Sequence, residues 1–277
     1  MTGVSFIVDE RGIGLLSIDR PQVRNALNWA AMQACAQAIE AAHRVAGLKA
    51  LIVAGAGKAF VSGGDLSELQ HYPTWEDGLR LAQVMGDALA RLEALPCPTI
   101  AAINGPARGG GAEIAVACDL RVMAEDADLG FVHTRLGIIP AWGGGQRLMR
   151  IVGYAHALEL IATGRVLSAG EALARGLVNL VAAPGQALAA ARELAAQIAN
   201  LPAAAVQAAK RVLRKGLVSG EDEALAAERA EFPALWDTDF RNEAIQRFLK
   251  KYKPGHNGRA PDETPNKRGI PSAKSAS

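Results

Sequence analysis

Two short apolar runs, each leading into a glycine-rich segment, constrain the fold of this chain more than any other feature. Residues 49–54 form a short run rich in β-branched residues, and residues 98–104 form another apolar run. Both predict buried strands. Helices and a further strand are expected around them, over residues 28–45, 74–95, 109–118 and 119–124. This alternation is typical of parallel strands joined by crossover helices, so we expect an α/β fold.

The two ends of the chain have different patterns. Residues 4–8 and 12–18 predict a strand hairpin. After residue 142 the pattern is mostly helical, with helices over 143–152, 154–163, 168–175, 186–200, 202–217, 221–235 and 240–250, and a short strand near 177–181. The last residues are rich in Pro, Gly and Ser, which predicts a disordered tail. The expected organisation is a core over 1–200, a C-terminal helical region over 201–253 and a tail over 254–277.

Composition narrows the classes of function. About half of the 277 residues are hydrophobic, enough for a sizeable core, and the net charge of +2 argues against a general nucleic-acid binder. The basic run at residues 210–215 is interpreted as a solvated helix face. Cys35, Cys97 and Cys118 lie far apart, which predicts a reducing compartment without a disulfide or a metal site. With no signal-peptide or membrane-span pattern, we expect a cytoplasmic protein.

The glycine-rich segment over residues 107–113 is the first candidate for chemistry. Its three glycines let the backbone approach a ligand closely, and the helix that begins there directs unpaired N–H groups and a positive dipole end outward. Glu113 lies three residues after Gly110, which places its carboxylate near the Gly110 amide. Glu113 is therefore a candidate acid, base or orienting group. The segment is equally consistent with a tight packing turn.

A second glycine-rich segment, residues 58–65, offers a backbone amide at Ser62. Loops at the carboxyl ends of two neighbouring strands would place two N–H groups around one carbonyl oxygen, which is the geometry of an oxyanion hole. An ordinary glycine turn is the alternative. A nucleotide-binding module at residues 55–58 is a competing hypothesis, but the third glycine is missing and Lys58 is followed by Ala59.

The third segment, residues 130–144, contains His133 and Trp142. An imidazole titrates near neutral pH and transfers protons there, although a single histidine is more often structural. Trp142 is consistent with core packing.

Together these segments resemble the crotonase superfamily, also called the enoyl-CoA hydratase/isomerase family. The resemblance covers residues 4–251 and includes the sequences RNAL at 24–27, KAF at 58–60 and GGGQRL at 143–148. It implies a spiral of β-β-α turns, a C-terminal helical trimerisation region and a homotrimer or dimer of trimers. It also implies oxyanion amides at Ser62 and Gly110. The residues it implies along the CoA thioester path are Arg24, Ala26, Ser62, Gly63, Gly64, Asp65, Gly110 and Trp142.

The resemblance also bears on the reaction. Hydratases of the family use two glutamates; Glu113 matches the first, and His133 occupies the position of the second. Residues 131–144 are more similar to the ethylmalonyl-CoA decarboxylase-like subgroup. We therefore expect decarboxylation of ethylmalonyl- or methylmalonyl-CoA, with His133 delivering a proton or orienting the carboxylate and Glu113 fixing geometry. Hydration of a 2-enoyl-CoA is the alternative, and a non-catalytic scaffold is a third hypothesis. We expect no metal, no cofactor beyond the CoA thioester substrate, and no nucleic-acid or membrane partner.

Overall fold

A six-stranded sheet forms the centre of the fold, in the order β1-β2-β3-β4-β6-β9. The computed structural model describes residues 2–251. The strands of this sheet are β1 (Val4–Val8), β2 (Ile13–Ile18), β3 (Ala50–Gly55), β4 (Thr99–Ile103), β6 (Leu120–Ala124) and β9 (Leu180–Ala182). β1 pairs antiparallel with β2, and all the other neighbours pair in parallel. The predicted hairpin and parallel strands are therefore confirmed.

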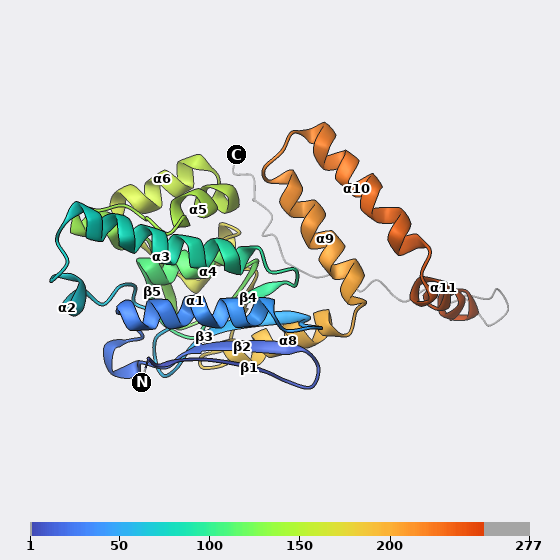
Figure 1. Cartoon of the computed structure of the whole chain (residues 1–277), viewed down its shortest axis with the longest axis horizontal. Helices are drawn as coiled ribbons and strands as arrows, with labels where there is room; N and C mark the ends of the chain where they lie inside the picture. The colour runs from blue at the N-terminus through green and yellow to red at the C-terminus, as the bar shows by residue number, and fades with distance from the viewer. Residues whose placement is uncertain (1, 252–277) are drawn as a thin grey trace, which may run out of the picture. The chain divides into compact units, whose positions relative to one another are not determined.

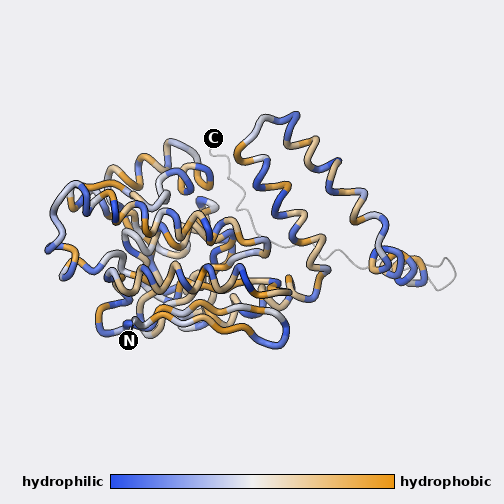
Figure 2. The backbone as a smooth tube through the Cα atoms, in the orientation of Figure 1, coloured by the Kyte–Doolittle hydropathy of each residue, from blue (hydrophilic) through white to orange (hydrophobic). Residues whose placement is uncertain are grey.

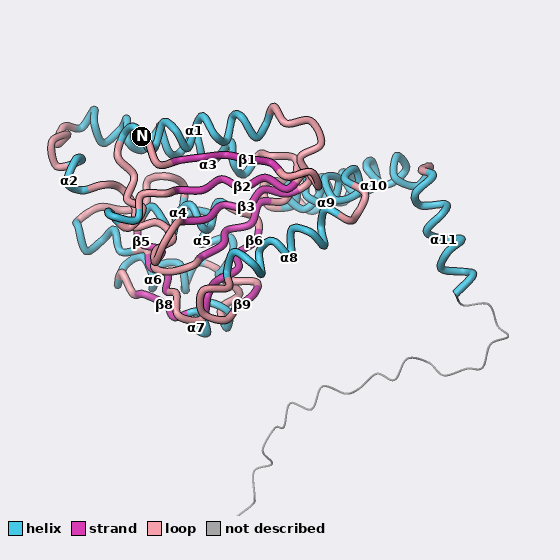
Figure 3. The backbone as a smooth tube through the Cα atoms, turned by 90° about the horizontal axis from the view of Figure 1, so that it is seen from below, coloured by secondary structure: helices cyan, strands magenta, loops and turns pink. Residues whose placement is uncertain are grey.

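Helices cover both faces of this sheet (Figures 1 and 3). α1 (Trp29–His43) and α3 (Trp75–Glu93) lie on one side, and α8 (Ala187–Ala199) lies on the other. Strand β3 shows why: Leu51 and Val53 belong to the core cluster that includes α1 and α3, whereas Ile52 packs in the cluster with α8. Alternate side chains of a strand face opposite sides, so a strand buried on both needs a continuous apolar run. Figure 2 shows these apolar strands in the interior.

Side-chain caps fix where the helices begin. Asn28 accepts a hydrogen bond from the Ala31 amide at 3.0 Å and caps α1, at the residue expected from the sequence. Thr74 and Asp77 form a reciprocal capping box at the start of α3. Each cap satisfies first-turn amides that have no partner inside the helix.

A second, three-stranded sheet was not predicted. It consists of β5 (Ala107–Arg108), β7 (Asp128–Gly130) and β8 (Val166–Ser168), which are too short to show a periodic pattern. The short helix α2 (Leu66–Leu69) and a 3₁₀ turn at Val132–Leu136 were also missed. The pairing of β5 with β7 brings Arg108 opposite Gly130, and the Gly109 amide donates to the Gly130 carbonyl at 2.9 Å. This sheet therefore joins two of the three segments that carry candidate residues.

The remaining helices are α4 (Gly110–Ala117), α5 (Gly144–Val152), α6 (Tyr154–Thr163), α7 (Ala169–Ala174), α9 (Ala203–Gly216), α10 (Glu221–Trp236) and α11 (Asp239–Lys251). The chain divides into two compact units, with the boundary between Pro233 and Ala234. In the second unit, the Arg241 guanidinium lies 3.7 Å from the centroid of the Trp236 ring. The expected domain boundary after residue 200 stays a prediction, and the expected tail lies outside the described residues.

Helix α9 corrects one interpretation of the sequence. Lys210 is buried, and its ammonium group donates to the Asp119 carboxylate at 2.7 Å and to the Cys97 carbonyl at 2.9 Å. The prediction of a solvated face is therefore wrong for Lys210, because this part of α9 packs against the core. None of the helices within residues 2–251 is long and apolar enough to span a membrane.

Candidate active site

A cavity of about 200 Å³ collects most of the candidate residues. Those that line it are Ser62, Gly63, Gly64, Gly110, Glu113, His133 and Trp142. Apart from Gly109, the rest of its lining is aliphatic, from Leu66, Leu69, Leu81, Val132, Leu136, Ile138, Ile139 and Ala141. Segments that follow β3 and β4, which are neighbours in the sheet, therefore meet at one site, as the sequence predicts.

Three other candidate residues lie elsewhere. Arg24 lines an adjoining cavity of about 260 Å³, together with Lys58, Arg108 and Ser62. Asp65 and Ala26 are buried and line neither cavity. The Asp65 carboxylate accepts from the Ser67 hydroxyl at 2.6 Å, and this bond and the Arg20 guanidinium nearby hold the pKa of Asp65 below its usual value. The Asp65 side chain therefore binds neighbouring side chains and does not line the cavity.

Glu113 is the most constrained side chain at the site. It is buried, and its Oε2 accepts hydrogen bonds from the backbone amides of Trp142 at 2.8 Å and Gly144 at 2.9 Å. Its Oε1 lies 3.0 Å from Nε2 of His133. Both carboxylate oxygens are engaged, so Glu113 fixes the His133 ring and the backbone at residues 142–144.

The His133 imidazole has one nitrogen in use and one without a partner. An ionised carboxylate only accepts hydrogen bonds, so Nε2 donates to Glu113. Nδ1 is buried and has no hydrogen-bond partner among the described residues. Neutral His133 therefore presents an acceptor at Nδ1, and protonated His133 presents a donor. His133 lines the cavity, and a buried polar atom without a partner calls for one, such as an atom of a ligand.

The backbone amides at the site differ from the expected pair. The Ser62 amide, expected to bind a substrate oxygen, donates to the Arg24 carbonyl at 3.2 Å. Among the described residues, the amides of Gly64 and Gly110 have no hydrogen-bond acceptor. Gly110 opens α4, where a first-turn amide lacks an intrahelical partner. The two loops are close together, because a Cβ built on Gly63 would lie 3.2 Å from the Gly110 nitrogen.

Asn25 is a positioning residue that the sequence analysis did not single out. Its fully buried amide donates to the carbonyls of Ala56, Ala59 and Phe60 at 2.8–3.0 Å. Arg24 and Asn25 both have positive φ angles, 53° and 59°, which are uncommon for residues other than glycine. The Asn25 bonds hold this backbone against the loop before Ser62. Asn25 falls within the RNAL sequence at 24–27 that carries the resemblance, but that pattern alone does not show what its side chain binds.

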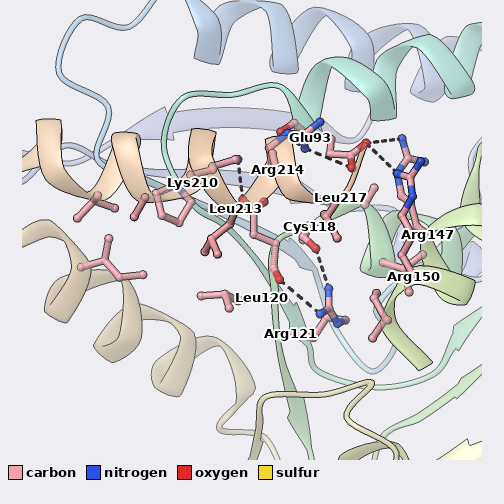
Figure 4. A pocket seen from close by; sticks show the side chains of 18 of the residues that line it. Glu93, Cys118, Leu120, Arg121, Arg147, Arg150, Lys210, Leu213, Arg214 and Leu217 are labelled. Atoms are coloured by element: carbon pink, nitrogen blue, oxygen red, sulfur yellow. Dashed lines mark hydrogen bonds and ion pairs between the residues drawn. The ribbon is translucent and has the colours of Figure 1, made fainter. Parts of the chain in front are cut away.

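A larger cavity, of about 470 Å³, lies elsewhere, between α9 and the ends of α4 and α5 (Figure 4). Several of its charged groups bind one another: Glu93 pairs with Arg147 at 3.1 Å and with Arg214 at 3.2 Å, and Lys210 pairs with Asp119. None of the candidate catalytic residues lines it. We therefore assign the candidate active site to the smaller cavity. Residues 2–251 contain no cluster of three or more His, Cys, Asp or Glu suited to a metal ion.

Known proteins resemble this chain over most of its length. A family model described as enoyl-CoA hydratase/isomerase matches residues 9–259. The short-chain-enoyl-CoA hydratase of Clostridium acetobutylicum is 37% identical over 251 residues, which is 90% of this chain and 96% of that protein. The ethylmalonyl-CoA decarboxylase of Rattus norvegicus is 36% identical over 249 residues, 88% of this chain and 83% of that protein. The crystal structure of an enoyl-CoA hydratase from Bacillus anthracis matches with a TM-score of 0.85 and 35% identity, over 90% of this chain and 96% of that one.

Proposed function

The chain belongs to the enoyl-CoA hydratase/isomerase family, and on that premise we propose that it decarboxylates a short branched malonyl-type CoA thioester, such as ethylmalonyl-CoA or methylmalonyl-CoA. The Glu113–His133 pair carries the proposal. An imidazole with an unpartnered nitrogen stands where the family resemblance implies the second glutamate of a hydratase. The similarity to a decarboxylase from Rattus norvegicus supports the same reaction.

Two backbone amides would bind the thioester carbonyl oxygen. We assign them to Gly64 and Gly110, in place of the expected Ser62, because the Ser62 amide already donates to Arg24. The positive end of the α4 dipole adds to the stabilisation of negative charge at Gly110. Such donors stabilise the enolate oxygen more than the ground-state carbonyl, which is how they lower the barrier.

The reaction then needs one bond to break and one proton to arrive. The bond between the α-carbon and the carboxylate breaks, its electron pair forms the thioester enolate, and carbon dioxide leaves. Protonated His133 donates its Nδ1 proton to the α-carbon, which yields the saturated acyl-CoA. Glu113 stabilises the imidazolium and fixes its ring through Nε2.

The lining of the cavity favours loss of the carboxylate. Among the described residues that line it, Glu113 and His133 are the only ionisable side chains, and the rest are mainly aliphatic. An apolar lining solvates a carboxylate poorly and imposes no such penalty on neutral carbon dioxide. Conversion of the carboxylate to neutral carbon dioxide therefore removes this solvation penalty and favours decarboxylation.

Hydration of a 2-enoyl-CoA is the second candidate, because hydratases are among the similar proteins. Hydration needs a group that activates water and a group that delivers a proton. The protein engages both Oε2 lone pairs of Glu113 and one of Oε1, so Glu113 keeps a single acceptor site at Oε1 and His133 would supply the second group.

One experiment separates the two reactions. The purified protein is incubated in parallel with ethylmalonyl-CoA, methylmalonyl-CoA and crotonyl-CoA, and the products are followed by mass spectrometry. We expect loss of carbon dioxide from a malonyl-type ester without hydration of crotonyl-CoA. Hydration of crotonyl-CoA alone would refute the decarboxylase and establish the second candidate.

The oligomeric state and the cellular location of the enzyme are part of the proposal. We infer a homotrimer or a dimer of trimers from the family, and sedimentation equilibrium tests it by a mass three or six times that of one chain. Two apolar side chains are more than half exposed, Leu213 on α9 and Leu217 directly after it, and they support a subunit interface there. A cytoplasmic location and the absence of a further cofactor stay predictions.

A further inference from the structure

A large apolar side chain packs against each of the two glycines assigned to the thioester oxygen. A Cβ built on Gly110 would lie 2.1 Å from an atom of the Trp142 ring, and one built on Gly64 would lie 2.6 Å from Cδ1 of Leu69. Both side chains line the candidate active site. They therefore bound the space beside the reacting atoms from two sides.

Trp142 forms a firmly held wall. It is buried, its backbone amide donates to Glu113 at 2.8 Å, and its carbonyl accepts from Nη1 of Arg147 at 2.7 Å. Arg147 is itself fixed by its ion pair with Glu93. Because the backbone of Trp142 is held on both sides and its ring is buried against Gly110, the ring has little room to move away from a bulky substrate.

The rest of the cavity leads to an open mouth. Leu66, Leu136, Ile138 and Ile139 line it and are 53–70% exposed. An acyl chain that extends in this direction meets no buried wall among these residues. The space is thus narrow at Leu69 and Trp142 and wide further along.

We propose that Leu69 and Trp142 select the size of the substituent on the carbon next to the thioester carbonyl. The inference rests on the proposed placement of the carbonyl oxygen at the Gly64 and Gly110 amides, which puts this carbon beside both side chains. Small branches such as the ethyl group of ethylmalonyl-CoA fit, and two long branches on this carbon do not. The site selects much less for the length of a linear acyl chain than for branching, since a linear chain extends toward solvent through the open mouth.

Unreactive saturated CoA thioesters test this selection without any decarboxylation. Calorimetric titration of the full-length protein compares butyryl-CoA (linear), octanoyl-CoA (linear and longer) and 2-propylpentanoyl-CoA (doubly branched at the α-carbon). For the wild type we expect at least tenfold weaker binding of the branched ester than of either linear one, since one methylene against an apolar wall already changes binding about tenfold.

Two substitutions enlarge the narrow part of the cavity. Trp142→Leu and Leu69→Ala each remove side-chain bulk. Trp142→Leu also keeps the peptide groups of residue 142 that bind Glu113 and Arg147. We expect each substitution to strengthen the binding of 2-propylpentanoyl-CoA relative to butyryl-CoA by about tenfold. The ratio of the affinities for octanoyl-CoA and butyryl-CoA should stay unchanged. Trp75→Leu is the matched control, because Trp75 is 75% exposed and lies outside the cavity lining, and it should keep the wild-type ratios.

The possible outcomes are distinct. Wild-type ratios in both variants, with native circular dichroism, would overturn the inference. If Trp142→Leu does not fold, Trp142→Phe replaces it, and an unchanged ratio in Trp142→Phe and Leu69→Ala overturns the inference equally. A shifted ratio in a protein that never decarboxylates would support the inference and refute the proposed reaction alone. A wild-type protein that binds none of the three esters would refute both.

Discussion

Glu113 and His133 divide the work of the site between an orienting group and a proton carrier. The carboxylate accepts two backbone hydrogen bonds at Oε2 and lies 3.0 Å from Nε2 of the imidazole at Oε1, so the protein holds it in one orientation. Nδ1 of the imidazole has no partner among the described residues, and we assign it to the substrate. This division suits the protonation of an enolate, which needs one positioned donor, better than the addition of water, which needs two groups.

His133→Ala tests the proton carrier. We expect kcat for decarboxylation to fall about 100-fold or more, because general acid catalysis by a positioned side chain is worth that much, with a smaller change in KM. Steady-state kinetics with the malonyl-type substrate measures both. His156→Ala is the matched control, since His156 is exposed and outside the cavity, and it should keep wild-type kinetics. Unaltered kcat in His133→Ala would remove His133 from the mechanism.

At the scale of the elements, the start of α4 is set by a contact that only glycine allows. A Cβ on Gly111 would lie 1.8 Å from the Val61 carbonyl oxygen, which is backbone and cannot swing aside. The close contact brings the segment before Ser62 against the first turn of α4, and it accompanies the isolated bridge between Val61 and Ala107. The spacing of the two glycine-rich loops thus depends on this position.

Gly111→Ala is therefore expected to lower the free energy of unfolding by about 1–3 kcal/mol, the usual cost of overpacking a tight site. Gly78→Ala is the matched control. Gly78 lies inside α3 with no atom within 4 Å of a built Cβ, so alanine should stabilise the helix by about 0.5–1 kcal/mol. Urea unfolding measures both, and a Gly111→Ala variant as stable as Gly78→Ala would contradict the contact.

Helix α9 offers a second test at this scale. Lys210→Ala leaves the partly buried Asp119 without its cation, and we expect a loss of about 3 kcal/mol in the free energy of unfolding. Lys215 pairs with Glu223 at the surface, so Lys215→Ala should leave the urea midpoint almost unchanged. Equal midpoints for the two variants would mean that α9 does not pack on the core as described.

For the whole molecule, sequence patterns were sufficient where an element is long or buried on both faces. The run at 49–54 predicted β3, and Asn28 predicted the start of α1. The second sheet could not be predicted, because strands of two or three residues carry no period, although it brings Gly109 beside Gly130. The Ser62 amide could not be judged either, because its acceptor depends on the left-handed backbone at Arg24.

Alkaline stability is a property of the whole core. Burial raises the pKa of the Cys35 and Cys118 thiols to about 12 and that of Cys97 to about 11, from 9.0. Above pH 9 the unfolded chain loses thiol protons that the folded chain keeps, so stability is fully present below pH 9 and falls between pH 9 and about 12. Urea midpoints at pH 8, 9 and 10 should decline, and less steeply in Cys118→Ala. Identical slopes would show that Cys118 ionises equally in both states.

The central claim is that the site forms a thioester enolate by decarboxylation and protonates it. The most direct measurement is the reaction of ethylmalonyl-CoA with the wild-type protein in D₂O, with the product analysed by mass spectrometry. We predict butyryl-CoA with a single deuterium on the α-carbon, because the proton that His133 delivers exchanges with solvent. Recovery of unchanged ethylmalonyl-CoA, from a preparation that hydrates crotonyl-CoA under the same conditions, would contradict the claim.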